Sequence, residues 1–319
     1  MAESVVLVDI VRSGFVEGRH RGSLVVLDRD GSIAATLGDP HAVIFPRSVN
    51  KPMQVAAMLA LGLRLDGRHL ALAAASHSGE SFHLDGVEEI LASAGLDPGD
   101  LQTPPELPYG VAARDEWIKC GRAPSRLAMN CSGKHAAMLA TCVARGWDLD
   151  SYLSPAHPLQ RAIEEHVSDL AGEEISVVGI DGCGAPVLGV SLVGVARAFR
   201  RHCLDDSPAA PRRVADAMRA FPEWVGGTDR DVTELMRGVP GLLAKDGAEA
   251  VYAAALADGR SVALKIDDGA QRARRVAMAS LLARIGVRGD VLEQQATEPL
   301  WGGGDVVGEL RAAAALNSL

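Results

Sequence analysis

The sequence predicts an α+β protein in which strands from both ends of the chain complete one sheet and helices lie between them. Residues 4–10 and 23–37 are rich in valine, isoleucine and leucine, and a third apolar run at 261–266 follows an Asp-Gly turn signal. Between these regions apolar residues recur at the three- and four-residue spacing of helices. Terminal strands around a helical middle are typical of the α+β class.

The first strands and the first helix have specific local signals. Asp28-Arg29-Asp30-Gly31 interrupts the run 23–37 and predicts a hairpin turn. A helix is expected from Ser48 to Gly62, with Pro52 in its first turn, where a missing N–H costs little. Further helices are expected at 85–94 and 155–170, and an ordered proline-rich loop at 103–110.

The second half of the chain is less uniform. Residues 175–180 predict a short buried strand, and 186–201 predict an apolar helix that opens on a proline. Residues 248–256 are alanine-rich and compatible with a helix, but the following Asp-Gly turn favours a hairpin. Residues 272–285 predict an amphipathic helix, and the tail at 311–319 is expected to fray.

Size and charge limit the kinds of partner. The 319 residues and 33.4 kDa correspond to about two domains, or to one large two-lobed domain, at roughly 150 residues per domain. We expect one domain over 1–319, with a sheet lobe at about 1–45 and 240–310 and a helix-rich lobe at about 46–239. A net charge of −9 argues against nucleic acid and membrane surfaces and favours a small-molecule substrate.

The N-terminal sequence and the number and spacing of the cysteines both predict the cellular compartment. No basic segment precedes an apolar stretch at the N-terminus, and the longest apolar-rich stretch, 185–196, is far shorter than the ~20 residues that span a bilayer. The five cysteines are odd in number and widely spaced, so free thiols or metal ligands are expected rather than a disulfide framework. These features predict a cytoplasmic protein.

Lysine is rare, which draws attention to each one. The chain has 27 arginines and only 5 lysines, and a retained lysine can lose its proton near neutral pH, which arginine cannot do. Ser48 and Lys51 share one face at the start of the predicted helix. Burial and the positive helix end both favour a neutral amine at Lys51, able to take the Ser48 proton. The alternative without a function is that Ser48 caps the helix and Lys51 is a surface lysine.

Other polar clusters are ambiguous on spacing alone. Residues 76–80 form a loop that offers hydroxyl and backbone N–H groups to a ligand, or simply cap the next helix. Cys131 and Cys183 lie in two separate turns and could share a metal ion, but their spacing matches no common zinc motif and favours buried thiols.

Five motifs together carry a family resemblance. They are Arg47-Ser48-Val49-Asn50-Lys51-Pro52, Ser76-His77-Ser78-Gly79-Glu80, Asn130-Cys131-Ser132-Gly133-Lys134-His135, Asp181-Gly182-Cys183-Gly184-Ala185-Pro186 and Leu264-Lys265-Ile266-Asp267-Asp268-Gly269. From residue 8 to about 286 the sequence resembles the class 3, or rhizobial-type, L-asparaginases. This family uses serine–lysine tandems and is related in fold to serine β-lactamases and glutaminases. The resemblance implies that fold, with an antiparallel sheet from both chain ends and a helical lobe between.

The resemblance also implies roles for individual residues. It implies two catalytic tandems, Ser48 with Lys51 and Ser78 with Lys265. It implies a zinc ion bound by three ligands beside the site and a homodimeric assembly. The implied zinc ligands are Cys131, Lys134 and Cys183, and the implied substrate-binding or supporting residues are Arg47, His135, Asp181 and Asn130.

The implied reaction is hydrolysis of L-asparagine to L-aspartate and ammonia through a serine acyl-enzyme. The Ser-x-x-Lys motif is shared with β-lactamases, but their Ser-Asp-Asn and Lys-Thr-Gly motifs are absent, which disfavours a β-lactam substrate. A glutaminase of the same fold is the close alternative, because one methylene offers limited discrimination. A catalytically silent amino-acid-binding protein is the alternative from another class.

Overall fold

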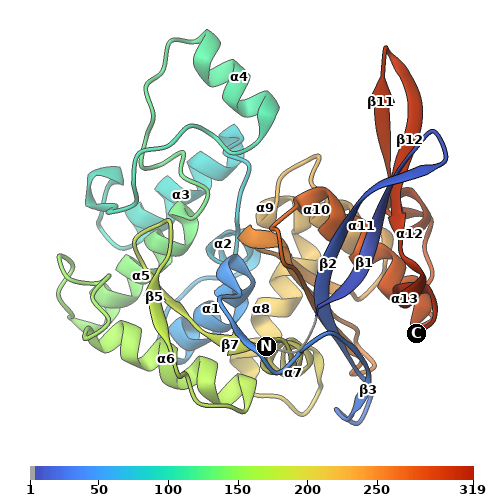
Figure 1. Ribbon diagram of the computed structural model, residues 1–319. Helices are drawn as coiled ribbons and strands as arrows, with labels where there is room; N and C mark the ends of the chain where they lie inside the picture. The colour runs from blue at the N-terminus through green and yellow to red at the C-terminus, as the bar shows by residue number, and fades with distance from the viewer. Residues whose placement is uncertain (1–3) are drawn as a thin grey trace. The chain divides into compact units, whose positions relative to one another are not determined.

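The computed structural model describes residues 4–319, which divide into two compact units (Figure 1). The first unit comprises residues up to 49, 190–204 and 234–319, and the second comprises 50–189 and 205–233. Residues 190–204, which the sequence analysis groups with the helix-rich lobe, cluster with the sheet.

An antiparallel sheet of eight strands forms the first unit. Its strands are β1 (Val5–Arg12), β2 (Phe15–Leu27), β3 (Ile33–Leu37), β8 (Leu243–Asp246), β9 (Val251–Ala255), β10 (Ser261–Ile266), β11 (Thr297–Gly302) and β12 (Asp305–Ala312). The order is β11-β12-β1-β2-β10-β9-β8, with β3 paired to β2. β1 pairs with β12, so the blue and red ends of the chain lie side by side in Figure 1. The predicted α+β class, with one sheet completed by both chain ends, is confirmed.

The centre of this sheet is built from small apolar residues. β9 is buried along its whole length, and the hairpin to β10 turns at Gly259 with a φ of 92°. The antiparallel pairing of β9 with β10 confirms the hairpin prediction. Glycine suits the turn because an L side chain rarely adopts that φ. The sheet packs against α7 (Leu192–Cys203) and α11 (Gln271–Arg284). The unit also holds β4 (Val43–Ile44), β7 (Val190–Ser191), η3 (Ala248–Ala250), α12 (Asp290–Gln295) and α13 (Ala314–Asn317).

Three local predictions are wrong. The helix expected over 186–201 begins only at Leu192, because the Ser191 side chain caps it by accepting from the Gly194 N–H at 2.9 Å. Residues 186–188 instead form β6 (Pro186–Leu188), paired with β5 (Val178–Ile180). β5 is not buried, as Ile180 is 83% exposed. The tail is ordered in β12 and α13, where Leu316 is buried.

Helices dominate the second unit. They are α1 (Lys51–Ala60), α2 (Gly67–Ala73), α3 (Ser81–Ser93), η2 (Pro98–Asp100), α4 (Val111–Lys119), α5 (Ser132–Arg145), α6 (Pro158–Ala171), α8 (Ala209–Ala220) and α9 (Pro222–Val225). α1 packs against α5, α6 and α8, and α3 packs against α5. The helix expected at 48–62 starts as a 3₁₀ turn, η1 (Arg47–Asn50), and continues as α1 with Pro52 as its second residue. α10 (Asp231–Gly238) crosses the boundary between the two units.

Within residues 4–319, no helix has the length and apolar character required to cross a bilayer.

Candidate active site

Lys51 is the first residue of α1, and its side chain is buried in the second unit. The residue is 1% exposed. Its Nζ donates to the backbone oxygen of Ala75 and, at 3.0 Å, to Oγ of Ser76. The structure therefore places a lysine amine in direct contact with a serine hydroxyl. The serine is Ser76, a partner that spacing along the chain did not predict.

The loop that carries Ser76 is held by backbone hydrogen bonds from both of its flanks. The N–H of Ser76 donates to the Val225 carbonyl at 3.0 Å, and the N–H of His77 donates to the Asn130 carbonyl at 3.1 Å. Oγ of Ser78 donates to the Gly226 carbonyl at 2.9 Å. The polar loop at 76–80 is thus more than a cap for α3, because chain segments far away in sequence fix its conformation.

His77 anchors this loop as a neutral side chain. It is fully buried, and its Nε2 pairs with Oγ of Ser132 at 2.9 Å. Burial, with the nearby charges of His83 and Lys51, lowers the pKa of His77 well below its ordinary value. Burial likewise lowers the pKa of His83 to about 4. Neither imidazole therefore adds positive charge beside Lys51 at neutral pH.

Two glycines enclose Ser78. A Cβ on Gly227, whose φ is 136°, would stand 2.2 Å from Oγ of Ser78. A Cβ on Gly110 would stand 2.8 Å from Cβ of Ser78. Real Cβ atoms do not approach so closely, so only glycine fits at these positions. The backbone is therefore built closely around the Ser78 side chain.

Cys131, Lys134 and Cys183 come together in one buried cluster of the second unit. Nζ of Lys134 lies 3.3 Å from Sγ of Cys183. Cys131 and Cys183 belong to one packed group with Met129 and Ala185, and all three candidate ligands are nearly solvent-free. Lys134 stands on the first turn of α5, and Cys183 follows β5, so the fold closes a contact that spacing did not favour.

The electrostatics of this cluster favour a thiolate paired with an ammonium. The hydrogen bond from Cys131 is the strongest influence on Cys183; with the Lys134 charge it outweighs burial and holds the pKa of Cys183 well below its usual range. The same hydrogen bond, with burial, raises the pKa of Cys131. Burial opposes the charge on Lys134, but the neighbouring sulfur atoms of Cys183 and Cys131 raise the pKa of Lys134 overall.

Three of the four expected supporting residues, Asn130, His135 and Asp181, interact with the same cluster. Oδ1 of Asn130 accepts from Sγ of Cys131 at 3.0 Å. Nδ1 of His135 pairs with the Tyr152 hydroxyl at 2.7 Å. Its buried Nε2 has no nitrogen or oxygen partner among residues 4–319, and the Cys183 thiol is its polar neighbour. The negative charge of Asp181 acts on Lys134.

In the first unit, Lys265 projects from β10 toward a strained backbone segment. Its Nζ donates to the Glu249 carbonyl at 2.8 Å and to its neighbour's carbonyl, that of Ile266, at 3.2 Å. Glu249 has a φ of 56°, in the left-handed region that non-glycine residues rarely adopt. Burial lowers the pKa of Lys265; Glu249 and nearby aspartates oppose the shift, and Arg47 adds to it.

Both predicted tandems join residues of different units. Ser48, in η1, and Lys265 belong to the first unit, whereas Lys51 and Ser78 belong to the second. The pairing of Ser48 with Lys51, and that of Ser78 with Lys265, therefore remain predictions.

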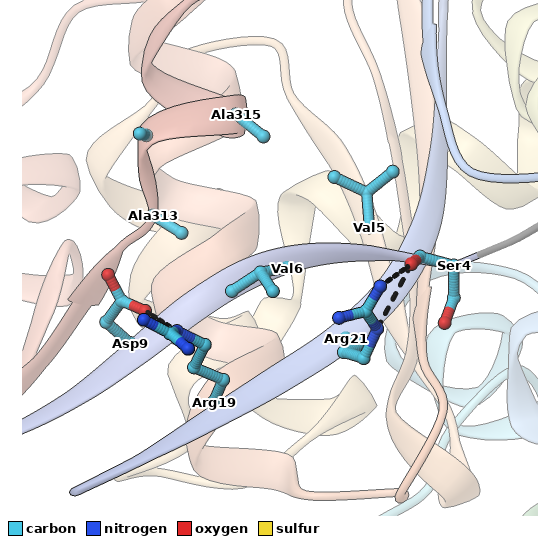
Figure 2. Close-up of a pocket in the computed structure, with 9 residues that line it drawn as sticks. Ser4, Val5, Val6, Asp9, Arg19, Arg21, Ala313 and Ala315 are labelled. Carbon is cyan, nitrogen blue, oxygen red and sulfur yellow. Dashed lines mark hydrogen bonds and ion pairs between the residues drawn. The ribbon is translucent and has the colours of Figure 1, made fainter. Parts of the chain in front are cut away.

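A separate cavity in the first unit contains none of the predicted site residues. It has a volume of about 480 Å³. Figure 2 shows that its charged groups are engaged locally: the Arg21 guanidinium donates to the Ser4 carbonyl, and Arg19 pairs with Asp9 at 3.4 Å. We assign no catalytic role to it.

Sequence reasoning missed two kinds of residue. Ser76 was noted only as part of a polar loop, although it is the serine that Lys51 contacts. Tyr109 and Arg230, which line a cavity with Ser78, were not singled out. The available signal was a glycine pair, Gly226-Gly227, followed by polar residues in an otherwise helical region.

Comparison with known proteins identifies the family. A family model described as L-asparaginase II matches residues 8–312. No curated protein matches the sequence. Among solved structures, Mglu in its native form is 14% identical with a TM-score of 0.44, over 81% of this chain and 63% of that chain. A Bacillus glutaminase is 11% identical with a TM-score of 0.39, over 83% of this chain and 91% of that chain.

The chain thus spans about 63% of the length of Mglu. The family model, in contrast, extends over nearly all of this sequence, from the first strand to the last. The protein belongs to the L-asparaginase II family.

Proposed function

We propose that the protein is an L-asparaginase, which hydrolyses L-asparagine to L-aspartate and ammonia through a serine acyl-enzyme. The observation that carries the proposal is the buried Lys51 amine bonded to the serine loop 76–80, in a chain that the L-asparaginase II model matches over residues 8–312. A lysine amine next to a serine hydroxyl is the arrangement that activates serine as a nucleophile. The observed hydroxyl is that of Ser76, and the pairing of Lys51 with Ser48 is part of the proposal.

In the first half-reaction, Ser48 Oγ attacks the side-chain amide carbon of asparagine. Lys51 accepts the Ser48 proton, and backbone N–H groups near Ser48 and Ser78 hold the oxyanion. The carbon–nitrogen bond then breaks, and a proton delivered to the nitrogen lets ammonia leave. In the second half-reaction water attacks the ester, releases aspartate and returns the proton to Ser48.

Ser78 and Lys265 act in the proton transfers. Ser78 carries a proton to the leaving nitrogen and accepts one from the hydrolytic water, and Lys265 serves as its base. The lowered pKa of Lys265 supports this role, because it increases the fraction of neutral amine near neutral pH. Arg47, whose charge contributes to that shift, is proposed to assist in substrate binding.

The titration of Lys265 leads to a pH prediction. Activity requires the neutral amine, so it falls as the pH drops through the pKa of Lys265. The Glu249 charge raises that pKa, and Glu249→Gln is therefore expected to shift the acid limb of the kcat profile to lower pH. Glu298→Gln, which removes an ion-paired carboxylate elsewhere in the same unit, is the control. Identical acid limbs in all three proteins would show that Lys265 does not control this limb.

The cluster of Cys131, Lys134 and Cys183 fits a zinc ion. It supplies two thiols and an amine in a solvent-free setting, and Nε2 of His135 faces the same sulfur. Among residues 4–319 no group of three or more His, Cys, Asp or Glu side chains could hold a metal, so this site depends on a lysine ligand. Bound zinc would orient the substrate, with the three residues as protein ligands and Lys134 binding as a neutral amine.

Zinc content tests this part of the proposal. Protein prepared without chelator is expected to contain about one zinc per chain by elemental analysis. Cys183→Ser should weaken zinc binding by about tenfold or more, because it removes a ligand. Cys142→Ser, which changes another buried thiol on α5, is the matched control. Less than a tenth of an equivalent of zinc, or equal loss in both variants, would leave Cys131 and Cys183 as ordinary buried thiols.

Ammonia release from L-asparagine tests the proposed reaction. Hydrolysis of a chromogenic cephalosporin, assayed in parallel, measures β-lactamase activity, because β-lactamases share the Ser-x-x-Lys motif. We expect ammonia and no useful β-lactamase activity. Rapid cephalosporin hydrolysis without ammonia would overturn the proposal, and binding of asparagine without turnover would favour the silent binding protein.

The family resemblance also supports a homodimer, and the five unpaired, widely spaced cysteines support a cytoplasmic location. This part of the proposal is independent of the chemistry. Light scattering should give twice the chain mass of 33.4 kDa, whereas a monomer at all concentrations would contradict the dimer.

A further inference from the structure

A cavity beside Ser78 carries charges that the serine–lysine chemistry does not use. It has a volume of about 580 Å³, and every residue that lines it belongs to the second unit. Ser78 lines it, Arg230 adds one positive charge, and three carboxylates, those of Glu80, Asp115 and Asp229, add negative charge. A cavity of this size accommodates a small polar molecule next to the serine hydroxyl.

Arg230 is held in a defined orientation. Its guanidinium stacks over the Tyr109 ring at 4.8 Å, and Tyr109 lines the same cavity. Its Nη1 donates to the backbone carbonyl of Ser76 at 3.4 Å, so the guanidinium is hydrogen-bonded to the serine loop 76–80. A planar guanidinium positioned in this way is prepared to recognise a planar carboxylate.

The segment that carries Arg230 is also locked to the serine loop. Oε1 of Glu80 accepts from the Thr228 N–H at 2.8 Å, and its Oε2 accepts from the Thr228 hydroxyl at 2.5 Å. Gly227 lies directly against Ser78, as its missing Cβ shows. Arg230 and Ser78 are therefore fixed relative to each other by two independent sets of contacts. Such preorganisation is typical of binding sites and reduces the entropy cost of binding.

The chemistry of the cavity matches a small zwitterion. Arg230 offers a cation for a carboxylate, and Asp229, its neighbour, offers an anion for an ammonium group. The small residues Gly110, Ala112 and Ala113 also line the cavity and leave room for the backbone of a short amino acid. Both charged groups of an α-amino acid find partners of opposite sign here.

We propose that Arg230 binds the α-carboxylate of the amino-acid substrate and Asp229 its α-ammonium group, so that this cavity selects α-amino acids over simple amides. The inference rests on the proposed asparaginase function and assigns specificity residues to the same site. Arg230 thereby places the side-chain amide against the serine hydroxyls.

The test compares substrates that lack one charged group. L-Asparagine, β-alaninamide, which lacks the α-carboxylate, and succinamate, which lacks the α-amino group, are assayed with wild type, Arg230→Gln, Arg230→Lys and Asp229→Asn. Arg230→Gln should lower kcat/KM for asparagine by about 10- to 100-fold, mainly through KM, with a much smaller change for β-alaninamide. Asp229→Asn should show the same contrast between asparagine and succinamate. Arg145→Ala, which removes an arginine stacked on Trp147 outside this cavity, is the control.

The outcomes separate the inference from the proposed function. If wild type releases ammonia from asparagine but Arg230→Gln lowers kcat/KM equally for asparagine and β-alaninamide, the assignment of Arg230 is wrong and the asparaginase function stands. If wild type releases no ammonia, that function fails, and calorimetry with L-aspartate and β-alanine then tests the cavity. Tight binding of L-aspartate that Arg230→Gln abolishes and Arg230→Lys partly restores would support it; equal binding by all variants would overturn it.

Discussion

Replacing Lys51 by arginine is expected to lower kcat for asparagine by about 10³-fold or more. Arginine keeps the positive charge but cannot accept the Ser48 proton at any accessible pH. Lys51 is buried against Ala75 and Ser76, so its amine is shielded from bulk solvent. Lys51→Met, which removes the charge and keeps the length, should be equally inactive.

Two controls make the Lys51 result interpretable. Lys119→Arg changes an exposed lysine in the last turn of α4 and should retain full activity. Thermal unfolding of each variant shows whether activity is lost from a folded protein. If folded Lys51→Arg retained most of the wild-type kcat, Lys51 would act through its charge alone and the base mechanism would be wrong.

Ser48→Ala is expected to have the largest effect, a loss of about 10⁴-fold or more in kcat, because it removes the nucleophile. Intact-mass spectrometry after acid quenching should detect an aspartyl ester in wild type and none in Ser48→Ala. Ser78→Ala removes a proton carrier and should keep the ability to form the ester at a reduced rate. An ester that persists in Ser48→Ala and disappears in Ser78→Ala would exchange the roles of the two serines.

Local sequence patterns predicted strands within 4–10, 23–37 and 261–266 and the hairpin at Gly259, because these features depend on neighbouring residues. They did not predict β8, β11 or β12. The errors occur where distant contacts decide the structure. Pro186 was expected to open a helix, but it pairs with Ile180 in a short hairpin, and the Ser191 cap starts the helix later. Periodicity cannot detect a strand that is specified by its partner.

In the candidate site, too, local spacing predicted pairs of neighbouring residues and missed contacts between residues far apart in the sequence. Spacing singled out Ser48 and Lys51 because they are close in sequence. Lys134 and Cys183 are separated by 49 residues, so spacing alone favoured ordinary buried thiols until the fold placed them in contact. Arg230 contacts the carbonyl of Ser76 across 154 residues of chain, and no local pattern around either residue points to the other. The predictions that spacing did not support, above all the shared site of Cys131, Lys134 and Cys183, came from the family resemblance that the five motifs carry together.

Side-by-side ammonia release from L-asparagine and L-glutamine, with kcat/KM measured for both on one preparation, decides whether the protein is an asparaginase. We expect a higher kcat/KM for asparagine by about tenfold or more, since one methylene in a fitted cavity is worth roughly 1–3 kcal/mol. Faster hydrolysis of glutamine would contradict the asparaginase assignment and establish the protein as a glutaminase.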